Sequence, residues 1–360
     1  MPSLKEIKGR INSISSTLAI TSAMKMVAAA KLQKAQMAIQ NMLPYERRLH
    51  SMLIDLMGAM NISAAASEDG SVRGSGSAER GFDQSGDRLS LSNRHDLAGM
   101  DGAYSLMAQR EVRKVAIVAF ASNSSLCGAF NSNAIREATA VINEYRASGL
   151  GDADITVYSV GRKMAEAMKK LGFPSPADFT KMSDSPSYDA ASALAQELFD
   201  GFVSGRFDKV ELVYNHYKST SSQPTTRQTY LPLSLADATA DLQAGKITDS
   251  ASETDTNRVA EPVGAPVVRQ SSPTAEASDL IVEPSKEELI ATLLPKVIRL
   301  RIFTTLLDSA AAEHAARTVA MQLATDNGND LLQELTLEYN KGRQQKITSE
   351  ILDLVGGSMQ

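Results

Sequence analysis

The stretch "LLPKVIRLRIFTTLLDSAAAEHAARTVAMQLATDNGNDLLQELTLEYNKG", residues 293–342, decides the fold. Its contact positions recur at alternating steps of four and three residues over seven heptads, which is the repeat of a coiled coil. Small residues in the middle of this seam allow a second helix to approach closely. The seam consists of Leu293, Val297, Leu300, Thr304, Leu307, Ala311, His314, Thr318, Met321, Thr325, Gly328, Leu332, Leu335, Tyr339 and Gly342.

The C-terminal helix is predicted within residues 283–360. Pro284 stops the preceding chain, and Ser285 with Glu288 three residues later forms a capping box. A continuous helix from Ser285 to Gly356 would span about 110 Å. Pro295 is expected to kink its first turns.

The partner of this helix is predicted in residues 1–60, where apolar residues again recur at steps of three and four. The phase drifts through "AMKMVAAAKLQKAQ", a stutter that locally unwinds a coiled coil, and Pro44 should bend or interrupt the helix. Pairing the two helices antiparallel would leave the longer C-terminal helix overhanging by several turns. The N-terminal seam starts with Leu4, Ile7, Ile11, Ile14 and Leu18.

Between the helices, residues 111–242 predict a small Rossmann-like α/β domain with a mostly parallel sheet. The fold class is therefore α/β, with a long antiparallel coiled coil of the terminal helices. Strands are expected within 113–122, 154–160, 209–219 and 225–235, and helices at 131–147, 162–171 and 188–204. Residues 61–110 and the acidic linker 243–282 have low complexity, and we expect them to be disordered because they hold little apolar surface to bury.

Charge and composition exclude several classes of protein. The net charge of −5 argues against a nucleic-acid binder. Residues 1–48 differ, with eight Lys and Arg against two Glu, which indicates either a solvated face or a face turned toward an acidic partner. The longest apolar run, 115–121, is far shorter than the roughly 20 residues of a membrane span.

No catalytic, cofactor or metal site is predicted. The chain has neither G-x-G-x-x-G after its first strand nor a P-loop, and its four His residues lack metal-ligand spacing. His314 is expected to be a packed polar residue of the seam. Cys127, the single cysteine, follows a strand and precedes a helix, where a nucleophile could lie, but no acid–base partner can be identified. Two alternatives stay open: a coiled-coil adaptor with an α/β binding module, and an enzyme that uses Cys127.

Several segments resemble one known family. "SLKEIKGRINSISSTLAITSAMKMVAAAKLQKAQ", "SLCGAFNSN", "VELVYNHYKS", "EPSKEELIATLLPK" and "AAEHAARTVAMQLATDNGNDLLQELTLEYNKGRQQKITSEILDLVGG" are similar, in this order, to segments of the gamma subunit of F-type (proton-translocating) ATP synthases. The two low-complexity regions look like insertions relative to typical members.

This resemblance implies a non-catalytic subunit, the rotating central shaft of the synthase. It implies one copy per complex inside a hexamer of alpha and beta subunits, with the epsilon subunit and the c-subunit ring bound at the α/β domain. Membrane contact would occur only through the c ring, so the chain would be peripheral at the cytoplasmic face of the bacterial inner membrane. ATP synthesis would depend on ion transport through the ring.

Residue roles follow from the same resemblance. Met24 and Lys25 would face a beta subunit, and Arg343 and Gln344 would hydrogen-bond a beta-subunit loop, with Thr348 and Glu350 at nearby polar positions. The apolar tip that turns in the collar of the hexamer would consist of Ile351, Leu354 and Val355.

Three departures from the family pattern affect these expectations. Ser22 replaces a common Lys, which removes one charged contact. Residues 123–125, "NSS", replace a commoner Asp-Arg-Gly and are expected to weaken an ion pair. Gly342 replaces a common Ala and is expected to loosen the helix at Arg343 and Gln344.

Overall fold

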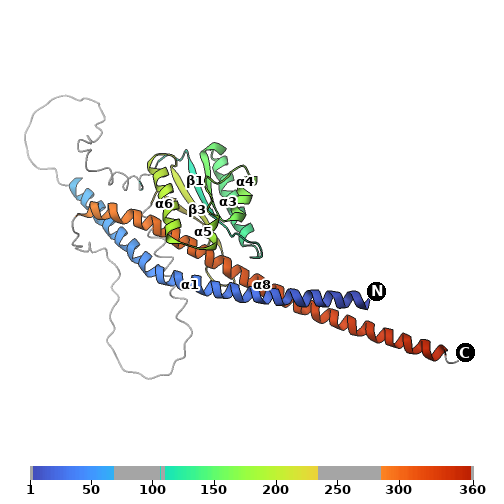
Figure 1. The fold of residues 1–360 in the computed structure, drawn as a ribbon. Coiled ribbons are helices and arrows are strands. Elements are labelled where there is room, and N and C mark those ends of the chain that lie inside the picture. The colour runs from blue at the N-terminus through green and yellow to red at the C-terminus, as the bar shows by residue number, and fades with distance from the viewer. Residues whose placement is uncertain (1–2, 69–105, 107–109, 234–284, 358–360) are drawn as a thin grey trace, which may run out of the picture.

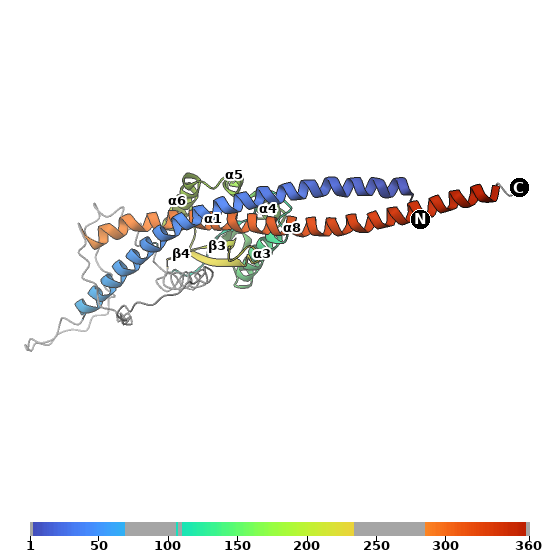
Figure 2. The same ribbon diagram turned by 90° about the horizontal axis from the view of Figure 1, so that it is seen from below.

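Two long helices and a flanking α/β domain make up the structure, a computed structural model that describes residues 3–68, 106, 110–233 and 285–357. Helix α1 (Leu4–Glu68) and helix α8 (Lys286–Gly357) lie side by side and run in opposite directions. The C-terminal end of α8 projects beyond the N-terminus of α1 (Figures 1 and 2). The predicted antiparallel coiled coil with an overhang is therefore confirmed.

The register of the two helices is visible in three facing pairs. Thr325 donates a hydrogen bond from Oγ1 to Oγ1 of Thr21 at 3.2 Å. A Cβ atom built on Gly328 would lie 2.6 Å from Cδ2 of Leu18, and one on Gly342 would lie 3.1 Å from Cδ2 of Leu4. Each step forward along α1 thus matches an equal step backward along α8. Both glycines lie in the seam, as predicted.

Both helices extend through their prolines, and α1 runs further than expected. Pro44 and Pro295 lie inside α1 and α8, although the axis of α1 curves over its middle part (Figures 1 and 2). The predicted end of the first helix at residue 60 was wrong, because the helix continues to Glu68. Three alanines in "NISAAASE" have high helix propensity, which offsets the polar composition. The rest of the two low-complexity regions, 69–105, 107–109 and 243–282, lies outside the described residues.

The sheet is mostly parallel, as predicted. Its strands are β1 (Val115–Phe120), β2 (Ile155–Val160), β3 (Lys209–Asn215) and β4 (Thr225–Leu231), in the order β2-β1-β3-β4. β1 pairs in parallel with β2 and β3, and β4 is an antiparallel edge strand. β1 is buried along its whole length, which explains why its sequence is a continuous apolar run instead of an alternating one.

Helices cover both faces of this sheet. On one face, α3 (Phe130–Ala147) and α4 (Arg162–Lys170) pack on alternate β1 residues such as Val115 and Ile117. On the other, α6 (Tyr188–Val203) and α8 pack around Val118 and Phe120 (Figure 1). The short helices η1 (Asp152–Asp154) and α5 (Thr180–Asp184) were not predicted.

Helix α8 belongs to two cores at once. Its first half contributes Leu294, Ile298, Ile302 and Leu306 to the core of the sheet and α6. Further along, Ala311 and Ala315 pack against Leu32 of α1 in a smaller cluster. The α/β domain is therefore not a separate module, because a helix of the coiled coil forms part of its wall.

Alanine substitutions at the two seam glycines should have different effects on the free energy of unfolding. Gly328→Ala gains about 0.5–1 kcal/mol of helix propensity, but its Cβ would overlap Leu18, and such overpacking costs about 1–3 kcal/mol. We expect a net loss of about 1 kcal/mol in the free energy of unfolding. Gly342→Ala meets only the tip of Leu4 at the start of α1, so it should be neutral or stabilising.

Urea unfolding followed by circular dichroism measures both effects. In a Leu18→Ala background, the Gly328→Ala change should become stabilising, because the overlapping methyl groups are gone. Destabilisation that persists in this background would show that Leu18 is not the cause.

Candidate functional site

Among the described residues, no helix lies beside the projecting end of α8, residues 343–357. Leu4, the first residue of α1, faces Gly342, so α8 continues alone for about 22 Å beyond this pair. Residues 343–352 are all exposed, as are Leu354 and Val355. A single helix with so little packing is stable only marginally by itself in water, so this surface is suited to contact another chain.

The polar residues predicted as contacts lie at the base of the projecting end. Arg343 and Gln344 extend exposed side chains that make no hydrogen bond or ion pair to another described residue. Thr348 donates its hydroxyl to the Gln344 carbonyl at 2.9 Å. Glu350 lies 3.7 Å from Nζ of Lys346, an exposed pair one helical turn apart. Arg343 and Gln344 are thus the freer hydrogen-bonding groups of the four.

The apolar tip is exposed as well. Leu354 is 74% exposed, and Ile351 and Val355 are more than half exposed. Two further apolar side chains, Ile347 and Leu352, are also exposed and were missed by the sequence prediction. Ile347, Ile351 and Leu354 follow at steps of four and three, so the helical period could have revealed this second stripe. A contiguous exposed apolar patch of this kind marks an interaction surface.

A second exposed surface lies on α1. Met24 and Lys25 are half-buried, whereas their neighbours Met26 and Val27 are 65% and 58% exposed. Ile20, 60% exposed, lies seven residues before Val27 and therefore on the same side of the helix. These three exposed residues were missed. Because Thr21 faces Thr325, this surface lies about 30 Å along the axis from Arg343, so the structure has two separate candidate surfaces.

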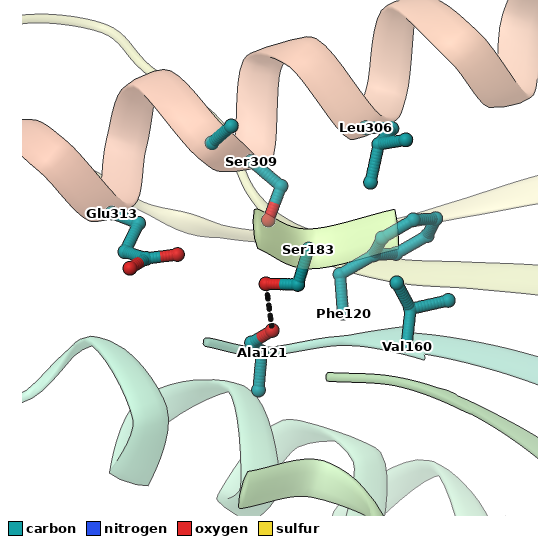
Figure 3. A pocket seen from close by; sticks show the side chains of 8 residues that line it. Phe120, Ala121, Val160, Ser183, Leu306, Ser309 and Glu313 are labelled. Carbon is teal, nitrogen blue, oxygen red and sulfur yellow. Dashed lines mark hydrogen bonds between the residues drawn. The ribbon is translucent and has the colours of Figure 1, made fainter. Parts of the chain in front are cut away.

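The carboxyl edge of the sheet, where open α/β sheets usually bind ligands, is filled by α8. Leu306, Ser309, Ala310 and Glu313 of α8 face the ends of β1 and β2 across a cavity of about 10 Å³ (Figure 3). That volume holds roughly one water molecule, whereas ligand pockets measure about 300 Å³ or more. Little room is therefore left between α8 and the ends of β1 and β2.

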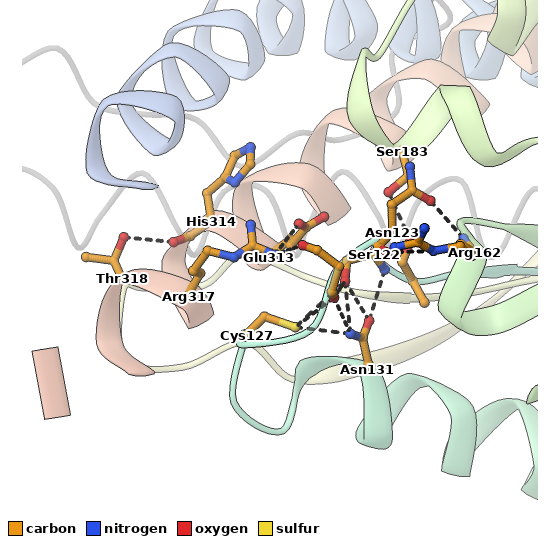
Figure 4. A network of polar contacts seen from close by, with 12 residues as sticks. Ser122, Asn123, Cys127, Asn131, Arg162, Ser183, Glu313, His314, Arg317 and Thr318 are labelled. Carbon is orange, nitrogen blue, oxygen red and sulfur yellow. Dashed lines mark hydrogen bonds and ion pairs between the residues drawn. The ribbon is translucent and has the colours of Figure 1, made fainter. Parts of the chain in front are cut away.

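Cys127 is part of a hydrogen-bonded loop between β1 and α3. The thiol is 1% exposed and accepts a hydrogen bond from Nδ2 of Asn131 at 3.1 Å (Figure 4). Leu126 and Gly128 on either side have positive φ angles of 68° and 58°. The thiol also lies 3.8 Å from Oγ of Ser122, so it is part of the hydrogen bonding within this loop.

The same loop is bonded to α8. Arg317 donates a hydrogen bond to Oγ of Ser124 at 2.7 Å and forms a largely buried ion pair with Glu313 at 2.8 Å (Figure 4). Burial raises the pKa of the Glu313 carboxyl, although Arg317 beside it acts in the other direction. Arg162 donates two hydrogen bonds to the Asn123 carbonyl. Asn123 and Ser124, expected to weaken an ion pair, thus accept hydrogen bonds from the charged guanidinium groups of Arg162 and Arg317.

Two His residues near α8 have opposite electrostatic environments. Nδ1 of His216 lies 2.6 Å from Oδ2 of Asp308, and this hydrogen bond raises the pKa of His216. His314, in the seam as predicted, has its pKa lowered to about 4 by burial and by the charges of Arg317 and Lys31. Its Nδ1 has no hydrogen-bond partner among the described residues. His314 is therefore neutral at physiological pH, while His216 holds its proton more tightly than usual.

Neither a membrane span nor a metal cluster occurs in the described residues. No described helix is both long and apolar enough to cross a bilayer. No three His, Cys, Asp or Glu side chains come together as metal ligands in the described part of the chain.

Comparison with known proteins decides the family. A family model described as ATP synthase matches residues 3–359. The ATP synthase gamma chain of Phocaeicola vulgatus is 47% identical over 359 residues, and that of Bacteroides thetaiotaomicron is 45% identical over 360 residues, each match covering 100% of both chains. The chain belongs to the ATP synthase gamma chain family. Because these gamma chains match over their full length, both low-complexity regions lie within the shared stretch.

A solved structure supports the fold. A chain in the cryo-EM structure of the Euglena gracilis mitochondrial ATP synthase, OSCP/F1/c-ring, rotational state 3, superposes with a TM-score of 0.52 at 18% identity, covering 99% of this chain and 93% of that one. Family membership confirms the predicted resemblance and makes the chain a subunit of ATP synthase. It favours neither the free-standing adaptor nor the Cys127 enzyme.

The pair of His residues leads to a pH prediction. The His216–Asp308 bond stabilises the folded state fully below the unfolded pKa of 6.5 and is lost as pH rises through the raised folded pKa. His216→Gln should therefore cost more stability in acid than in alkali. The effect of His314 on stability has the opposite pH dependence. Because the pKa of His314 is lowered in the folded state, that state loses stability as pH falls from 6.5 toward about 4.

Thermal unfolding of the wild type, His216→Gln and His314→Gln between about pH 5 and about pH 9 measures both effects. The difference between wild type and His216→Gln should shrink with rising pH, and His314→Gln should gain relative stability in acid. Parallel pH profiles for all three proteins would contradict the assigned electrostatics.

Proposed function

We propose that this gamma chain is the rotating central shaft of the ATP synthase, which couples ion-driven rotation to ATP synthesis or hydrolysis on other subunits. One observation carries this proposal: α8 is a continuous 72-residue helix that belongs to the core of the α/β domain at one end and projects alone at the other. Its length is about 108 Å. A turn of the domain must therefore turn the projecting end.

The architecture suits torque better than it suits ligand binding. A coiled coil resists twisting because its interlocked side chains would have to slide past one another. In the first half of α8, the apolar core includes Leu49 and Leu53 of α1 together with the sheet and α6. The crevice where a ligand would bind is filled by the same helix.

The two exposed surfaces fit a surrounding ring of subunits. In this proposal Arg343 and Gln344 hydrogen-bond a beta subunit, Thr348 and Glu350 lie close to that contact, and Met24 and Lys25 face a beta subunit further down the shaft. The exposed apolar tip turns inside the collar of the alpha and beta hexamer. The tip includes Ile351, Leu354 and Val355, with Ile347 and Leu352 added by their exposure.

The α/β domain would bind the epsilon subunit and the c-subunit ring, with one gamma chain per complex. The chain would be peripheral at the cytoplasmic face of the bacterial inner membrane and would reach the membrane only through the c ring. Since the shaft is asymmetric, the three catalytic sites would meet different faces at any instant. Each catalytic site has states that differ in nucleotide affinity. A face of the shaft that contacts one of these states better than the others shifts the site toward that state.

Rotation of the assembled complex tests the proposal. The chain should purify with the alpha and beta subunits, and a bead fixed to the α/β domain should rotate when ATP is hydrolysed by an immobilised hexamer. A stable homodimer that never joins these subunits would support the adaptor in place of the shaft.

A double substitution tests the polar contact. Arg343→Ala with Gln344→Ala should reduce ATP synthesis by about tenfold, because hydrogen bonds to charged groups contribute about 1.5–3 kcal/mol each. The amount of assembled complex should stay unchanged, since neither side chain makes a hydrogen bond or ion pair to another described residue. The matched control is Lys341→Ala with Gln345→Ala, which removes the same charge and the same amide from the same stretch of helix. Equal losses in both double variants, or none in the first, would refute the assignment.

A further inference from the structure

The end of strand β3 contacts both long helices within two residues. Oδ1 of Asp308, on α8, accepts a hydrogen bond from the backbone N–H of Tyr217 at 2.9 Å. Oδ2 of the same carboxylate lies 2.6 Å from Nδ1 of His216. Both oxygens of one carboxylate are therefore bonded to consecutive residues of the α/β domain. Asp308 is largely buried, with 17% of its side chain exposed.

Tyr217 also reaches helix α1. Its hydroxyl accepts a hydrogen bond from Nε2 of Gln36 at 2.6 Å. Its ring packs against the cluster of Leu32 and Ala311, where α1 meets α8, and against the cluster of Cys127 and Ala312, where the domain meets α8. Tyr217 thus lies where the two helices and the domain come together.

These residues are held firmly by the sheet. The backbone N–H of His216 donates to the Pro224 carbonyl at 2.9 Å, which closes the connection between β3 and β4. The preceding residue, Asn215, is buried and donates from Nδ2 to the Phe130 carbonyl at 3.1 Å. A force on Asp308 or Gln36 is therefore passed to the sheet through short, bonded connections.

We propose that Gln36, His216, Tyr217 and Asp308 form the joint that transmits torque between the α/β domain and both helices of the shaft. This inference rests on the proposed rotary function. The apolar contacts of the core are non-directional, whereas hydrogen bonds lose strength steeply when their angle changes. Groups that fix the rotational position of the helices on the domain should therefore be hydrogen-bonded.

Three other polar contacts join the domain to α8. Tyr230 donates to the Ile298 carbonyl at 3.0 Å, Arg299 donates to Gln196 at 2.7 Å, and Arg317 donates to Ser124 at 2.7 Å. The joint differs because Tyr217 connects α8 and α1 to the same point of the sheet. If it opens, the domain can turn relative to the helix pair.

If these residues form the joint, substituting them should let the α/β domain turn relative to the shaft while ATP hydrolysis continues. Asp308→Asn keeps the shape and an acceptor for Tyr217 but removes the carboxylate charge opposite His216. Loss of a hydrogen bond to a charged group shifts an equilibrium between closed and open joints by about tenfold or more. Tyr217→Phe keeps the ring and the backbone bond but removes the bond from Gln36. Its effect should be smaller, about fivefold, because that bond is neutral.

The experiment uses the whole complex in inverted membrane vesicles. ATP hydrolysis is measured together with the membrane potential it generates, reported by a potential-sensitive dye, so the result does not depend on which ion is pumped. Both variants should hydrolyse ATP at the wild-type rate per assembled complex and generate a smaller potential per ATP. In single molecules stalled with the hexamer fixed, a bead on the domain should show a wider angular spread.

Asp152→Asn is the matched control. Asp152 forms a bidentate pair with Arg146 at 2.6 and 2.9 Å within the domain, so the same chemical change is made away from either shaft helix. Its potential per ATP should equal that of the wild type. A merely structural joint would lower assembly and hydrolysis together and leave the ratio unchanged.

Three outcomes overturn the inference: a wild-type ratio in both joint variants, an equal loss in Asp152→Asn, or an Asp308→Asn chain that fails to assemble while Tyr217→Phe keeps the wild-type ratio. A wild-type complex that hydrolyses ATP without rotation of the bead or any potential would refute the shaft function itself. The two failures are therefore distinguishable.

Discussion

The packing of α8 on two different partners is the constraint on which the rest of the structure depends. Its first half packs in the core of the α/β domain through residues such as Leu294 and Ile302. Its second half is one of the two helices of the coiled coil, with residues such as Ala311 and Gly328 facing α1. A helix has about 3.6 residues per turn, so one sequence can carry an apolar face for each partner. Because the helix continues from one core into the other, the domain and the coiled coil are mechanically a single body.

That constraint also explains why a Rossmann-like domain has lost the usual place for a ligand. In open parallel sheets, ligands bind in the crevice beyond the carboxyl ends of the strands. Here Leu306, Ala310 and Glu313 occupy that position and leave a cavity of about 10 Å³. The feature that attaches the shaft to the domain is thus the same feature that closes the ligand site. A fold alone does not imply function, and in this chain a helix of the shaft fills the crevice.

The sequence predicted those parts of the fold that leave a periodic signal. The heptads of α8 indicated an antiparallel partner and close approach at Gly328, and the continuous apolar runs located the strands. Helix α5 was missed because five residues are too few to show a period. The second apolar face of α8 was missed although Leu294, Ile298, Ile302 and Leu306 recur at steps of four, because the search followed one seam. The helical period could have revealed the stripe that contains Ile347, but the exposure of this stripe follows only from the register of α1.

Gly342 shows how register changes the meaning of a residue. From its sequence alone, a glycine beside Arg343 suggests a soft point in the helix. In the structure, Gly342 and Gly328 are 14 residues apart and face Leu4 and Leu18, which are also 14 residues apart. Each glycine leaves room for a leucine of α1, so the two helices stay close up to the first residue of α1. The close contact ends at Gly342, and the side chains free for another chain begin at Arg343. Gly342 therefore lies at the last close pair before α8 continues as a single projecting helix.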